Sequence, residues 1–208
     1  WNVLKELYPH SRNARLDKEA LSLWLRFGEI QARSVECREF NRTAFKDTLR
    51  EIRGLTTDTP EAFIPKMSEM CASSGVAFVL VPDIPRTHVR AAIRWLTPQK
   101  AIIQQGLGQR ANDQFWFDFY HGAAHILKHG REELILETGQ GDNRLREQEA
   151  DQFAADFLIP PGKFGTFKKQ ARFTKSSVLN FARSIEIAPG VVVGRLQREG
   201  FIRHNCLN

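Results

Sequence analysis

The stretch that decides the fold reads FWFDFYHGAAHILKHG and spans residues 115–130. It contains His121, His125 and His129, half of the six histidines of the chain. On a helix, side chains four residues apart lie one above the other on the same face. Asn112 or Asp113 can cap such a helix, and Gly130 can end it. The pattern therefore predicts a buried helix that presents His121 and His125 to one metal ion.

The spacing of this pair is that of H-E-x-x-H, in which two histidines bind zinc and the Glu is the general base. Gly122 stands where the motif has its Glu. A glycine inside a helix costs about 1 kcal/mol relative to alanine, and no turn signal nearby explains that cost. Pairs of the type H-x-x-x-H also arise by chance, so the pair needs a second line of evidence.

Composition sets the class of protein. The 208 residues are 42% hydrophobic and 26% charged, which fits a soluble chain with one sizeable core and an appendage. No apolar run approaches the roughly 18 residues of a membrane span, and we expect neither a signal peptide nor a membrane partner. The formal net charge of +6 fits an anionic partner or a solvated basic surface equally well.

Cysteine usage indicates the compartment. Cys37, Cys71 and Cys206 are isolated in the sequence and form neither a disulfide framework nor a Cys-x-x-Cys zinc site. We therefore expect a cytoplasmic protein. The chain begins at Trp1 rather than Met, and we expect it to be part of something longer.

Two regions are expected. Residues 1–59 look like a helical arm or linker, and a break at 56–60 separates them from a domain at 60–208. Within that domain we expect a helix at 61–73, a strand at 75–81, a hairpin of 92–96 with 101–105, a short strand at 133–137 and a helix at 144–159. Strands and helices do not alternate as β-α-β, which predicts an α+β fold with a small antiparallel or mixed sheet.

The last of these helices supplies a candidate third ligand. Leu145, Glu149, Phe153 and Phe157 recur every four residues, which places Glu149 in an apolar stripe. A buried carboxylate is costly unless it is paired or binds a metal. Glu149 would complete a His-His-Glu zinc site with an open fourth position. The alternatives are an ion pair with an arginine, or a place at the solvated edge of the stripe.

Three other residues are candidates for supporting roles. Asp118, one turn before His121, could accept a hydrogen bond from a ligand histidine or could be solvated. Asp156 is a weaker candidate for the same role. His129 lies at the helix end, where we expect it to interact with the helix dipole rather than with the metal.

From about residue 60 to residue 202 the chain resembles the ImmA/IrrE family of zinc metallopeptidase-like domains. The resemblance rests on residues 115–117, 126–130, 149–160 and 187–196 together with the histidine pair. It implies a zincin-like fold, Zn²⁺ bound by His121, His125 and Glu149, and a general-base Glu at position 122. The sequence departs from the family at that last position.

The resemblance extends to bacterial transcription regulators of the HigA antitoxin type, in which an XRE-like helix-turn-helix precedes the domain. It implies a protein partner, a repressor or a toxin, and DNA binding only through a domain that would precede Trp1. A homodimer is a further expectation. Because Gly122 has no side chain, we expect a loss of about 10²–10⁴-fold in rate, and hence a pseudo-enzyme or an inactivated variant.

Two other readings stay open. The domain could be a non-enzymatic antitoxin or regulatory module that binds a partner protein or an effector, with zinc structural or absent. Residues 177–185 and 191–199 also mimic a helix-turn-helix, although Val191, Val192 and Val193 suggest core packing rather than base readout. If the peptidase reading holds, Gly122→Glu should restore cleavage and, if the site has room, stabilise the helix by up to about 1 kcal/mol. A substrate peptide could then add to the hairpin as an edge strand.

Overall fold

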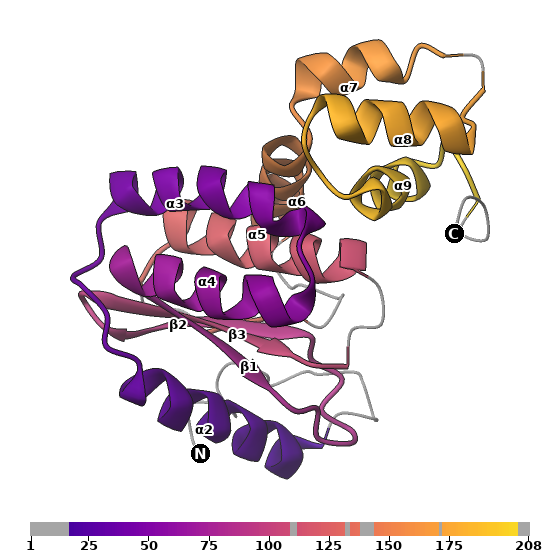
Figure 1. The fold of residues 1–208 in the computed structure, drawn as a ribbon. Helices are drawn as coiled ribbons and strands as arrows, with labels where there is room; N and C mark the ends of the chain where they lie inside the picture. The colour runs from indigo at the N-terminus through magenta and orange to yellow at the C-terminus, as the bar shows by residue number, and fades with distance from the viewer. Residues whose placement is uncertain (1–16, 109–111, 132–133, 138–143, 171, 204–208) are drawn as a thin grey trace.

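The computed structural model describes residues 17–108, 112–131, 134–137, 144–170 and 172–203. Within these residues the chain forms eight α-helices and a four-stranded mixed sheet, which confirms the predicted α+β class (Figure 1). The helices are α2 (Lys18–Ser34), α3 (Arg42–Gly54), α4 (Pro60–Ser73), α5 (Asn112–Lys128), α6 (Arg144–Leu158), α7 (Pro161–Phe167), α8 (Lys175–Ser184) and α9 (Pro189–Arg198), with a 3-10 turn, η1, at Leu55–Thr57. The strands are β1 (Val76–Val81), β2 (Ala91–Thr97), β3 (Lys100–Gly106) and β4 (Ile135–Glu137).

The strands lie in the order β1-β3-β2-β4. β1 and β3 are parallel, while β2 is antiparallel to both β3 and β4. The predicted hairpin is confirmed as β2 and β3, but the prediction that it offers an edge strand is wrong. Both of its strands are interior, because β1 pairs with β3 and β4 pairs with β2. Among the described residues, the edges of the sheet are β1 and β4.

Both faces of the sheet are covered by helices. Successive residues of β1 alternate between two cores, because side chains along a strand point to opposite faces. Val76 and Phe78 pack with α3, α4 and α5, whereas Ala77 and Val79 pack with α2. Figure 1 shows α4 and α5 on one face of the sheet, with α3 above them, and α2 on the other face.

The predicted helical arm contributes to both of these cores. The Asp17 carboxylate caps α2 by accepting bonds from two backbone N–H groups, and the side-chain oxygen of Asn41 caps α3 by accepting from the N–H of Ala44. Trp24 of α2 and Phe45 of α3 are fully buried. The predicted boundary between residues 59 and 60 stays a prediction. The ends of the two predicted regions, residues 1–16 and 204–208, lie outside the described residues.

The last three helices gather beside α6 at one end of the molecule (Figure 1). α8 and α9 were expected from the sequence, but α7 was not. α9 packs on α5 and buries Val191, Val192, Val193 and Leu196. Its valines therefore belong to the core, as their apolar character suggests.

Arg195 of α9 fastens this group to α6. Its guanidinium donates to the carbonyls of Ala155 and Ile159 at 2.5 and 2.8 Å, and it pairs with Asp156 at 3.1 Å. It also bonds to Glu199 at 2.9 Å. Asp156, predicted as a weak candidate for the metal site, is thus engaged in holding the C-terminal helices.

No helix in the described part of the chain combines the length and the apolar character needed to cross a membrane.

Removing Arg195 should destabilise the protein. Arg195→Ala leaves two carbonyls and a carboxylate without their donor, and we expect a loss of about 2–4 kcal/mol in the free energy of unfolding. The exposed Arg183 on α8 is a matched control, and Arg183→Ala should change stability by less than about 0.5 kcal/mol. Urea denaturation of both variants measures the difference, and equal stabilities would contradict this role for Arg195.

Candidate metal centre

The histidine pair lies on α5, in the buried half of that helix. The side chains of His121 and His125 are only 5% and 1% exposed. Their Nε2 atoms face each other at 2.9 Å, because the four-residue spacing stacks the two imidazoles on one face. The structure therefore confirms the predicted arrangement of this pair.

A carboxylate of α6 completes the cluster, and it belongs to Glu147. Its Oε2 lies 3.3 Å from Nε2 of His121, and its Oε1 lies 3.7 Å from Nε2 of His125. One ligand atom from each of these three side chains falls within 4.8 Å of the others. In the described part of the chain, this is the group of His, Cys, Asp and Glu side chains that could hold a metal ion.

The structure does not bring Glu149 to the histidine pair, and the prediction that Glu149 is buried is wrong. Its side chain is 51% exposed, and its carboxylate lies 2.7 Å from Nζ of Lys128 and 3.4 Å from Nε2 of His129. The cause is the rotation of α6 about its axis. Leu145, one turn earlier in the expected stripe, is 79% exposed, while the buried side of α6 is formed by Ala150, Ala154 and Leu158.

Sequence reasoning missed Glu147, although a signal was present. Glu147 precedes Ala150 by three residues, and Ala154 and Leu158 follow at steps of four. This series is also a helical face, and its small residues are typical of a close contact between helices. The prediction instead took the larger apolar residues of α6 as its buried face, and that face carries Glu149.

A second residue missed from the sequence is Asp151, one turn after Glu147. Its Oδ1 lies 2.9 Å from Nδ1 of His121. A carboxylate that accepts the Nδ1–H of a ligand histidine fixes the ring and leaves the Nε2 lone pair free for a metal. Glu147 and Asp151 thus address the two nitrogens of the same imidazole.

Asp118, predicted as a possible partner of a ligand histidine, is almost fully buried. Its carboxylate lies 3.1 Å from Nε of Arg90 and accepts a bond from Gln114 at 2.6 Å. Asp118 thus contacts a guanidinium and an amide, one helical turn before the histidine pair. His129, expected to interact with the helix dipole, instead bonds to His125, with the two Nδ1 atoms 2.8 Å apart.

The surroundings of the cluster shift the pKa values of His125 and Glu147 towards the forms that can bind a cation. Burial, together with the neighbouring His121, lowers the pKa of His125 from 6.5 to about 3, so its imidazole is neutral near pH 7. A hydrogen bond with His121 lowers the pKa of the Glu147 carboxyl, which is therefore ionised. Two imidazoles and one carboxylate are a ligand set that suits zinc and leaves a coordination position open.

Position 122 faces the sheet. A Cβ atom on Gly122 would lie 3.0 Å from Cγ1 of Ile93 on β2 and 3.6 Å from Cγ2 of Ile103 on β3. The first of these separations is tighter than ordinary van der Waals contact. The glycine that appears unexplained in the sequence is therefore explained by the close approach of α5 to the sheet.

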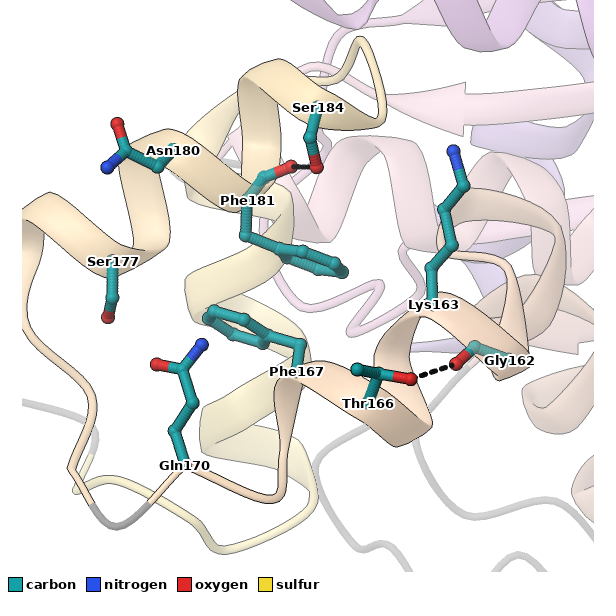
Figure 2. Close-up of a pocket in the computed structure, with 9 residues that line it drawn as sticks. All are labelled: Gly162, Lys163, Thr166, Phe167, Gln170, Ser177, Asn180, Phe181 and Ser184. Atoms are coloured by element: carbon teal, nitrogen blue, oxygen red, sulfur yellow. Dashed lines mark hydrogen bonds between the residues drawn. The ribbon is translucent and has the colours of Figure 1, made fainter.

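A separate groove of about 720 Å³ lies between α7 and α8 (Figure 2). The rings of Phe167 and Phe181 stack in it, with centroids 4.0 Å apart and planes within 7°. The side chains that line it include no histidine, cysteine or carboxylate. It therefore offers no metal ligands and no acid–base pair, and it does not share a residue with the histidine cluster.

Comparison with known proteins agrees with this geometry. Residues 109–197 match the family described as IrrE N-terminal-like domain, Peptidase_M78. The match includes α5, α6 and the three residues that could hold a metal ion, His121, His125 and Glu147. No curated protein matches the chain.

Metal content tests which glutamate binds. Purified protein should hold about one zinc ion per chain. Glu147→Ala removes a ligand and should abolish stoichiometric zinc, whereas Glu149→Ala removes an exposed carboxylate and should retain about one zinc. Elemental analysis after dialysis provides the measurement. Zinc lost from Glu149→Ala and kept by Glu147→Ala would restore the original assignment and refute the present one.

Proposed function

The domain at residues 109–197 belongs to the ImmA/IrrE family, and on that premise we propose that the chain is a zinc-binding, metallopeptidase-like module that binds a partner protein without cleaving it. The partner would be a repressor or a toxin, and the whole protein a cytoplasmic bacterial transcription regulator or antitoxin. Cys37 and Cys71 are free thiols, which supports a reducing compartment.

Gly122 is the observation that carries the absence of cleavage. Zinc held by His121, His125 and Glu147 would polarise a carbonyl and acidify a bound water. Peptide hydrolysis also needs a base that takes the proton of that water and passes it to the leaving amine. Glycine cannot do so.

Neighbouring carboxylates are engaged in other contacts and do not replace this base. Glu147 is placed as a ligand, Asp151 is bonded to Nδ1 of His121, and Asp118 is bonded to Arg90. Each is thus engaged in another contact of the site.

The packing around Gly122 limits the space for a side chain at this position. Ile93 lies so close that a side chain at 122 requires it to move by a few tenths of an ångström. The stability gain expected for Gly122→Glu was conditional on room at the site and stays a prediction, because crowding of the isoleucine opposes the benefit to the helix. Restoring a base requires space as well as a carboxylate.

The place where a partner could dock is suggested by the sheet. Among the described strands β4 lies at an edge of the sheet, and its Ile135 pairs with Ile93, the residue that approaches Gly122 beside the histidines. An extended peptide can add to an edge strand through backbone hydrogen bonds. A partner segment added to β4 would then be separated from β2, which carries Ile93, by β4 alone.

Catalysis can be tested by restoring base and space together. We expect the chain with Gly122 to bind its natural repressor or toxin partner, identified by cross-linking, and to leave it intact. Gly122→Glu with Ile93→Ala should cleave that partner when loaded with zinc, by supplying the missing general base. Gly122→Gln with Ile93→Ala has the same shape without the carboxylate and is the matched control, and electrophoresis of the partner measures cleavage.

The outcomes separate the two readings of the domain. Cleavage by the unaltered chain would overturn the proposal. Cleavage by the glutamate variant alone would show that only the base is missing. A glutamate variant that binds zinc and partner but cuts nothing would favour the purely non-enzymatic regulatory module.

A DNA-binding measurement tests the proposed division of labour. α9 buries its valines, and its Arg195 is occupied by α6, so the α8–α9 pair lacks an exposed reading face. With a net charge of +6, residues 1–208 should bind duplex DNA only weakly, with an affinity that falls steeply as salt increases and does not depend on sequence. Fluorescence anisotropy at several salt concentrations checks this, and tight sequence-specific binding would contradict it.

A further inference from the structure

The ligand histidine His125 has a buried neighbour at its other nitrogen. Its Nδ1 lies 2.8 Å from Nδ1 of His129, and the two rings are 4.7 Å apart between centroids. The His129 side chain is only 5% exposed. Water therefore has little access to this contact, which places His129 at Nδ1 of His125.

We propose that His129 is a positioning residue of the metal site, which accepts a hydrogen bond from Nδ1–H of His125 and so directs the Nε2 lone pair of His125 at the metal. This inference rests on the metal site of the proposed function. A neutral imidazole carries one proton, and ligation through Nε2 requires that proton to be on Nδ1. A lone pair on Nδ1 of His129 is the acceptor that favours this tautomer.

The same reasoning gives Glu149 a role outside the ligand set. When Nδ1 of His129 accepts, the proton of His129 is on Nε2, which lies 3.4 Å from Oε2 of Glu149. Lys128 holds the other oxygen of that carboxylate at 2.7 Å. Glu149 thus orients His129, but the link is long and its carboxylate is half-exposed, so water can replace it.

The two ligand histidines are supported by partners of different kinds. His121 has the carboxylate of Asp151, which is 55% exposed, while His125 has the imidazole of His129, which is nearly buried. Loss of the exposed carboxylate can be compensated by water. Loss of the buried acceptor removes a hydrogen bond from a site that water enters poorly, which is costly. His129 should therefore matter more to His125 than Glu149 does.

A matched pair of amides tests this assignment. In His129→Asn the side-chain oxygen can reach the place of Nδ1 and accept from His125. In His129→Gln the amide reaches the place of Nε2 and faces Glu149 instead. Both variants are polar and similar in size, so a general effect on packing should influence them alike.

The readout is zinc affinity, measured by competition with a chromophoric chelator. Loss of an outer hydrogen-bond partner typically weakens metal binding by about 10–100-fold, and we expect this for His129→Gln. His129→Asn should rescue affinity to within about threefold of the unaltered protein, and Glu149→Gln should also stay within about threefold. Circular dichroism verifies that each variant is folded.

Nitrogen NMR of the zinc-loaded protein gives a second readout that does not depend on activity. It should show His125 protonated at Nδ1 in the unaltered protein and in His129→Asn. Equal zinc affinity in the Asn and Gln variants, or a His125 that binds zinc through Nδ1, would overturn the positioning role. If the unaltered protein binds no zinc, the metal site of the proposed function fails, and the positioning role fails with it.

Discussion

The contact between Gly122 and the sheet is the constraint on which the site depends. The backbone of α5 lies against Ile93 and Ile103 because no Cβ atom separates them at this point. That contact holds α5 on β2 and β3, with the two imidazoles of the adjacent helical face near α6. Gly122, which stands where the zincin motif has its general-base Glu, is therefore also the residue that lets α5 pack on the sheet. This double role explains why the glycine can persist in a buried helix despite its cost.

The contact between α5 and α6 provides the rest of the site. Ala150 and Ala154 are fully buried and carry small side chains, which allows two helices to approach closely. With this face of α6 inward, Glu147 reaches both Nε2 atoms, and Asp151 reaches Nδ1 of His121. His129 serves the corresponding nitrogen of His125 from α5's own end. Each ligand histidine is thus held at both nitrogens, as a preorganised metal site requires.

Much of this arrangement could be predicted from the sequence, and the failures have a common cause. The buried helix, the histidine pair, the hairpin and the apolar α9 each depend on local spacing, which a sequence displays directly. The choice of Glu149 over Glu147 failed because α6 has two plausible faces, and the one with large residues was preferred. Phe153 and Phe157 are only half-buried, whereas the alanines mark the real contact. The prediction that the hairpin lies at an edge of the sheet failed because β1 pairs with β3 and β4 pairs with β2 over long distances in the sequence.

The central claim is that His121, His125 and Glu147 form a single metal site. Anomalous diffraction at the zinc absorption edge, from crystals grown with zinc, tests it most directly. The account predicts one strong peak within bonding distance of Nε2 of both histidines and of a carboxylate oxygen of Glu147, at about 2.0–2.2 Å. A peak bound by His129 and Glu149, or no peak near the histidine pair, would contradict it.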